Sequence, residues 1–130
     1  MADMMQFDLV SPERSVASLQ ASEVQIPGAE GDFTAMPDHA PVITTLRPGF
    51  LSVVSASGTE EFFVSGGFAE VSAEGASVLA EHACPRADVT REMLDQLISE
   101  ANAARDGAAA DAIDAASKYA ADLAAIGDGF

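Results

Sequence analysis

The chain has 130 residues and a formal net charge of −15, from 21 acidic side chains against six Lys and Arg. We expect such a chain to bind neither nucleic acid nor anionic lipid surfaces, because both attract proteins through Lys and Arg. Hydrophobic residues make up 48% of the sequence, so we expect a folded chain rather than a disordered one.

The remaining composition excludes several other classes. The single cysteine, Cys84, cannot form an intramolecular disulfide. No apolar run approaches the roughly 18 residues that predict a membrane span. The first residues carry no basic segment ahead of an apolar stretch, so no secretory signal is expected.

The first part of the chain has the texture of β-structure. All six prolines lie within the first 85 residues, and short apolar or alternating runs are separated by Gly and Pro turns. The expected strands lie near residues 5–9, 23–26, 42–43, 50–54, 62–64, 68–71 and 78–80. Many short strands without a helical period predict an all-β sandwich or barrel, and we take residues 1–87 as a β-sandwich domain.

Residues 88–130 change to a helical pattern. Asp88 or Thr90 can cap a first helix that ends near Gly107, and a second helix is expected over residues 108–126. The short break between them predicts a C-terminal antiparallel α-helical hairpin. Alanine fills 13 of the 25 residues from 101 to 125 and buries little apolar area, so we expect the hairpin to depend on the sandwich or on a partner.

We find no pattern typical of catalysis, of a cofactor site or of a metal site. His39 and His82 have no second ligand at a metal-binding spacing, and His82 with Cys84 reads as a structural histidine and a half-buried thiol. The acidic pair at residues 60–61 reads as a solvated surface. The acidic, proline-flanked segment 30–39 reads equally well as a solvated loop and as a binding loop.

Several motifs, in order, resemble one known family. These motifs are residues 28–33 (GAEGDF), 36–44 (MPDHAPVIT), 46–49 (LRPG), 65–71 (SGGFAEV) and 78–83 (VLAEHA). By them the chain is similar, from about residue 5 to residue 126, to the epsilon subunit of the bacterial F-type ATP synthase, the counterpart of the mitochondrial delta subunit.

The resemblance implies a non-catalytic rotor subunit of the central stalk. Such a subunit binds the gamma subunit and the polar loops of the c-ring, couples proton flow to ATP synthesis, and lies at the cytoplasmic face of the bacterial inner membrane without inserting into it. By position, Glu30, Gly31 and Asp32 would contact the c-ring, and His39 and Pro41 would lie at the gamma contact.

The hairpin, through which the chain would contact the alpha and beta subunits, departs from the pattern of inhibitory relatives, whose basic hairpins meet acidic loops of the beta subunits. Residues 88–130 carry nine acidic and three basic side chains, a net charge of −6. The stretch 94–99 (LDQLIS) also lacks the Arg and Ala of the ATP-sensing motif. We therefore expect weak inhibition of hydrolysis and weak ATP binding. The alternative, a nucleotide-sensing subunit that inhibits ATP hydrolysis, predicts measurable ATP binding.

Overall fold

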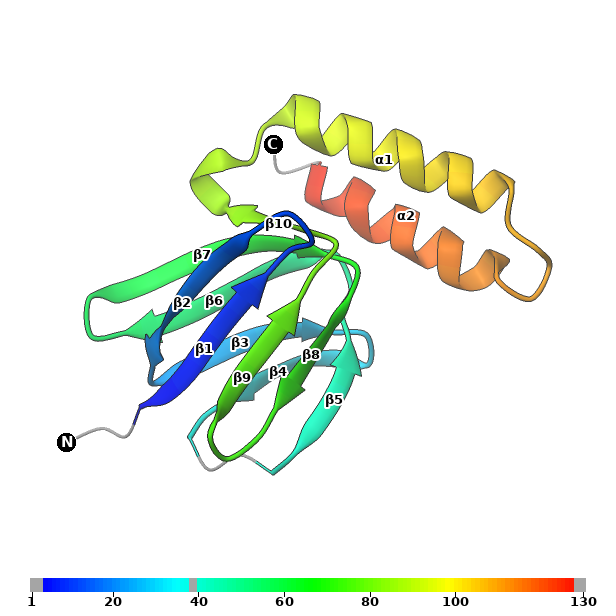
Figure 1. The fold of residues 1–130 in the computed structure, drawn as a ribbon. Helices are drawn as coiled ribbons and strands as arrows, with labels where there is room; N and C mark the ends of the chain where they lie inside the picture. The colour runs from blue at the N-terminus through cyan, green and yellow to red at the C-terminus, as the bar shows by residue number, and fades with distance from the viewer. Residues whose placement is uncertain (1–3, 38–39, 128–130) are drawn as a thin grey trace. The chain divides into compact units, whose positions relative to one another are not determined.

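The computed structural model describes residues 4–37 and 40–127, and the chain divides into two compact units, Met1–Ala87 and Asp88–Phe130. The first unit is built of strands and the second of two helices, as Figure 1 shows.

The strands of the first unit form two five-stranded sheets, so the predicted β-sandwich is confirmed. One sheet has the order β2-β1-β9-β8-β5, with bounds Ser15–Ala21, Met5–Val10, Gly75–Leu79, Phe68–Val71 and Val42–Thr45. The other has the order β10-β7-β6-β3-β4, with bounds His82–Pro85, Gly58–Ser65, Gly49–Ser55, Glu23–Gly28 and Gly31–Ala35. Neighbouring strands are antiparallel except β1 and β9.

Period-two alternation explains which side chains enter the core. In β1, Met5, Phe7 and Leu9 are buried while Gln6 is exposed, as a strand with one face toward a core requires. The opposite sheet supplies side chains such as Leu51 to the same cluster. Strands β4 and β5 each lie at one edge of their sheet, and the chain passes from one to the other between Ala35 and Val42.

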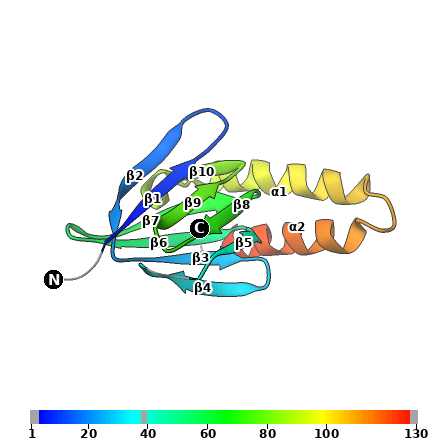
Figure 2. The same cartoon turned by 60° about the horizontal axis from the view of Figure 1, so that its bottom comes forward.

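Three strands, β2, β4 and β10, are not among the strands expected from the sequence. Strand β2 was not expected, because Ser, Ala and Gln between its apolar residues conceal the alternation. The segment expected as a long loop from residue 30 instead begins with strand β4, joined to β3 by the two-residue turn Ala29-Glu30. Gly28 pairs with Gly31 across this turn. Gly31 has a φ of 138°, a backbone conformation that glycine adopts readily and residues with a side chain rarely adopt. Figure 2 shows this β3–β4 hairpin along one edge of the sandwich.

The second unit is the predicted helical hairpin of α1 (Arg91–Asp106) and α2 (Ile113–Gly127). Thr90 caps α1, since its side chain accepts a hydrogen bond of 3.1 Å from the backbone N–H of Met93, and Gly107 ends the helix as expected. Helix α2 starts five residues later than predicted, because the backbone turns at residues 110–112, where Ala112 N–H donates to Ala109 O at 2.9 Å. None of the described helices is long and apolar enough to cross a membrane.

Candidate interaction site

The β3–β4 turn, taken from here on as residues 28–32, carries the acidic residues that were predicted to bind a partner, and its shape is set by close backbone contacts. A Cβ atom on Gly28 would lie only 2.8 Å from the carbonyl oxygen of Gly31, so the two strands approach more closely than a side chain allows. The N–H of Ala29 donates to Thr45 O at 2.9 Å, and Gly28 forms a β-bridge with Leu46. The turn is therefore attached to the end of β5 as well as to β4.

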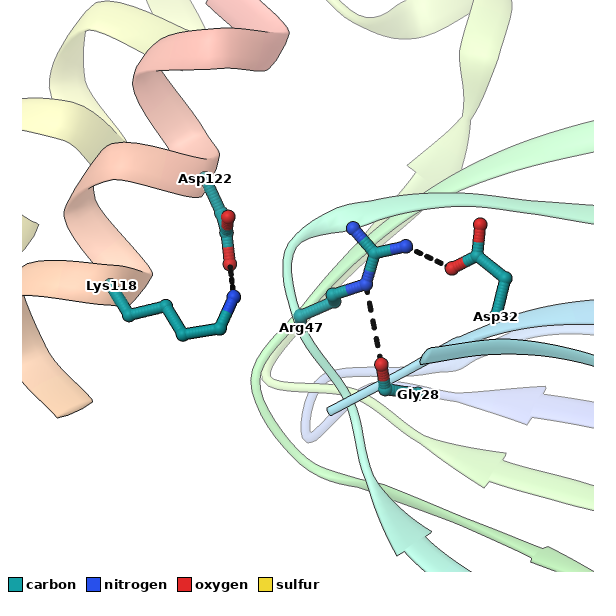
Figure 3. A network of polar contacts seen from close by, with 5 residues as sticks. All are labelled: Gly28, Asp32, Arg47, Lys118 and Asp122. Carbon is teal, nitrogen blue, oxygen red and sulfur yellow. Dashed lines mark hydrogen bonds and ion pairs between the residues drawn. The ribbon is translucent and has the colours of Figure 1, made fainter. Parts of the chain in front are cut away.

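Arg47 joins this turn from the segment that follows β5. Its backbone N–H donates to Pro27 O at 3.0 Å, and its Nε donates to Gly28 O at 3.2 Å. Its guanidinium also forms an ion pair with the carboxylate of Asp32 (Figure 3). The Arg47 side chain is 33% exposed and that of Asp32 is 68% exposed, so the pair lies at the surface with the arginine partly covered.

A groove of about 500 Å³ lies between the β3–β4 turn and β5. Glu30, Asp32 and Phe33 line it from the hairpin, and Val42 and Ile43 line it from β5. Ile43 is 70% exposed, the largest exposure among the large apolar side chains that the structure describes. Carboxylates beside exposed aliphatic groups suit a protein partner that offers both a cation and an apolar contact.

The predicted gamma-contact residues are only partly described. His39 lies outside the described residues, and Pro41 is exposed directly before β5. The structure therefore places Pro41 beside the strand that lines the groove and gives no position for His39.

A second exposed surface was not recognised from the sequence. Phe68 of β8 and Leu79 of β9 are direct cross-strand neighbours, 40% and 44% exposed, and Val10 pairs with Leu79 on the other side. Together with Pro12 they line an apolar hollow of about 420 Å³. The alternation of β8 predicts this exposed surface, because Phe68 lies on the same face of the strand as exposed Glu70 and on the opposite face from buried Ala69.

His82 and Cys84 both lie on β10, at the edge of the second sheet. The Nδ1 of His82 is 3.2 Å from the hydroxyl oxygen of Ser65, which is fully buried, and Cys84 is the cross-strand partner of Phe63. Among residues 4–37 and 40–127, no three His, Cys, Asp or Glu side chains are grouped so that they could hold a metal ion.

Each positive charge of the helical unit has an acidic partner within that unit. Arg91 pairs with Asp95 at 3.1 Å and Arg105 with Asp106 at 3.4 Å. Lys118 pairs with Asp122 at 3.2 Å, as drawn in Figure 3. Arg91 also donates from Nη1 to the carbonyl oxygen of Gly127, the last residue of α2.

Comparison with known proteins identifies the family. The model of the β-sandwich domain of ATP synthase delta and epsilon chains matches residues 4–86. The ATP synthase epsilon chain of Ruegeria sp. (strain TM1040) is 58% identical over 132 aligned residues, which cover 98% of this chain and 96% of the relative. The epsilon chain of Rhodobacter capsulatus is 58% identical over 127, with the same coverage of both chains.

The fold is also found among solved structures. A chain in the cryo-EM structure of the Euglena gracilis mitochondrial ATP synthase, OSCP/F1/c-ring in rotational state 1, superposes with a TM-score of 0.68 and 20% identity. The match covers 95% of this chain and 81% of the other, so the likeness includes the helical hairpin.

A β-sandwich followed by a helical hairpin defines the fold class of the chain, and its relatives are ATP synthase epsilon chains, a non-catalytic subunit of that complex. The chain belongs to the ATP synthase delta/epsilon chain family. Since its relatives are epsilon chains along nearly their whole length, the predicted resemblance to the epsilon subunit is confirmed.

Proposed function

We propose that the chain is a rotor subunit of the central stalk, which links the gamma subunit to the polar loops of the c-ring and so couples proton flow to ATP synthesis. The observation that carries the proposal is identity of 58% to epsilon chains over 98% of the sequence. In a bacterium this subunit would lie at the cytoplasmic face of the inner membrane, held there by its partners.

The β3–β4 turn is the proposed contact with the c-ring. Glu30 and Asp32 are exposed at the tip of a hairpin that backbone bonds hold to β5, and they line a groove with apolar side chains. Basic side chains in c-ring loops would meet the net negative charge of this turn, and complementary charges of this kind set orientation and the rate of association. The gamma subunit would contact the neighbouring segment that holds His39 and Pro41.

The helical hairpin is proposed to inhibit ATP hydrolysis weakly or not at all. Its net charge is −6, and Arg91, Arg105 and Lys118 each already pair with a carboxylate of the same unit. Acidic loops of the beta subunits would therefore meet like charge, which opposes insertion of the hairpin. Asp95, at the position of the ATP-sensing motif, pairs with Arg91, which supports weak ATP binding.

Co-purification tests the proposal. The tagged full chain, expressed with the other synthase subunits of its organism, should retain gamma and the c-ring after washing in detergent. Recovery of the chain alone would refute the stalk assignment. Equilibrium dialysis with ATP tests the alternative, since a nucleotide-sensing subunit would bind ATP at millimolar concentrations and a coupling subunit of this kind would not.

A further inference from the structure

We infer that the two carboxylates of the β3–β4 turn have different tasks: Glu30 meets the cation of the partner, whereas Asp32 and Arg47 form a positioning pair that holds the turn in shape. The inference rests on the proposed contact with the c-ring. It assigns a role to Arg47, which lies 15 residues beyond Asp32 in the sequence and outside the turn.

Arg47 is bonded to both strands of the hairpin at once. Its Nε binds Gly28 O at the end of β3, and its terminal nitrogen binds the carboxylate of Asp32 at the start of β4. Its backbone N–H binds Pro27 O at 3.0 Å, which fixes the base of its side chain against the same hairpin. The planar guanidinium of Arg47 can bond to Gly28 O and to the Asp32 carboxylate at the same time. The ammonium group of a lysine would not reproduce this geometry.

Glu30 differs from Asp32 in its surroundings. It is exposed in the turn, and the structure gives its carboxylate no hydrogen bond or ion pair with any described residue. The charge of Asp32 is balanced by Arg47, so a partner cation gains little from it. The net charge that the turn presents is therefore that of Glu30.

Charge and geometry make opposite predictions for Arg47. If Arg47 acted only through its charge, its removal would make the turn more negative and would strengthen binding of a basic loop. If it positions the turn, its removal frees Asp32 and loosens the hairpin, and the partner must then order it at an entropic cost. Arg47→Met should therefore weaken binding although the turn becomes more acidic.

The test measures binding of the full chain to the c-ring purified from the synthase of the same organism. Arg47→Met should weaken binding about fivefold, the effect of one interface side chain that must be ordered again. The double variant Asp32→Asn/Arg47→Met restores the net charge of the original pair and should still be about fivefold weaker. Arg14→Met, which removes one positive charge from the turn between β1 and β2, is the matched control and should bind as the unmodified chain does.

Glu30→Gln should weaken binding and reduce its dependence on salt, while Arg47→Met, which makes the turn more negative, should not reduce that dependence. Amide exchange gives a readout without the partner, since the N–H of Ala29 bonds to Thr45 O and should exchange faster in Arg47→Met than in Glu30→Gln. Stronger binding by Arg47→Met, or full binding by the double variant, would overturn the inference and leave the proposed contact standing. If the unmodified chain fails to bind the c-ring, the proposed contact is wrong and the inference falls with it.

Discussion

Replacing Gly31 by Ala tests whether the shape of the β3–β4 turn matters for function. Gly31 has a φ of 138°, and the added Cβ atom would meet no heavy atom within 4 Å. The cost is therefore backbone strain alone, about 1–3 kcal/mol for an L residue in this region. The chain can relieve this strain by opening the turn, which would displace Glu30 and Asp32.

Gly58 supplies a matched control in the same unit. It has a φ of 125°, it also has no heavy atom within 4 Å of an added Cβ, and it begins β7 after the turn from β6. Gly31→Ala and Gly58→Ala should lower the stability of the sandwich by similar amounts, about 2 kcal/mol each. In a domain of this size that corresponds to a decrease of roughly 8–16 °C in Tm, which calorimetry resolves.

The two variants should differ in binding. Gly31→Ala should weaken binding to the purified c-ring about tenfold or less, because the strain must be overcome again when the bound turn is re-formed. Gly58→Ala should bind as the unmodified chain does below its melting temperature. Equal binding by both variants, at equal loss of stability, would refute the reasoning that the turn geometry presents the acidic residues.

Three further predictions follow from single contacts and from charge. Gly67→Ala should lower the free energy of unfolding by more than about 4 kcal/mol, because the new Cβ would lie 1.9 Å from Leu79 O. A urea-unfolding midpoint equal to that of the unmodified chain would contradict this. Arg91→Met should destabilise the helical hairpin by about 1 kcal/mol, because Arg91 binds Gly127 O and Asp95 at a partly exposed site. Amide exchange in α2 should become faster, and unchanged exchange would count against that role of Arg91. Deleting residues 88–130 should leave ATP hydrolysis by the assembled synthase nearly unchanged, and a strong release of hydrolysis would show that the hairpin inhibits.

Local patterns predicted the elements that have strong periodicity or a capping residue. Strand β1 alternates apolar and polar side chains, and α1 lies between a capping Thr90 and a terminal Gly107. The prediction puts the start of helix α2 five residues too early, because the alanines at residues 108–110 favour a helix without indicating where it begins. Strand β4 was taken for part of a loop, although two glycines flanking a two-residue turn at residues 28–31 are a hairpin signal.

Only some residues of the candidate site can be predicted from the sequence. Glu30 and Asp32 were recognised from the family motif, and both are exposed on one turn. The contribution of Arg47 depends on its contact with Gly28, which lies 19 residues earlier in the sequence. Strand β5 brings the chain back to this point, and no local sequence pattern predicts that contact. The apolar surface of Phe68 and Leu79 likewise needs the pairing of β8 with β9 before the two side chains are neighbours.

Proton-driven ATP synthesis tests the central claim most directly. A synthase lacking its epsilon subunit would be reconstituted with the full chain, with the charge-reversed variant Glu30→Lys/Asp32→Lys, or with Glu60→Lys/Glu74→Lys, which makes the same change in net charge at exposed residues of other strands and turns. We predict that the unmodified chain and the Glu60/Glu74 variant restore coupled synthesis and that the Glu30/Asp32 variant does not. Full synthesis with the Glu30/Asp32 variant would contradict the proposed coupling role of the β3–β4 turn.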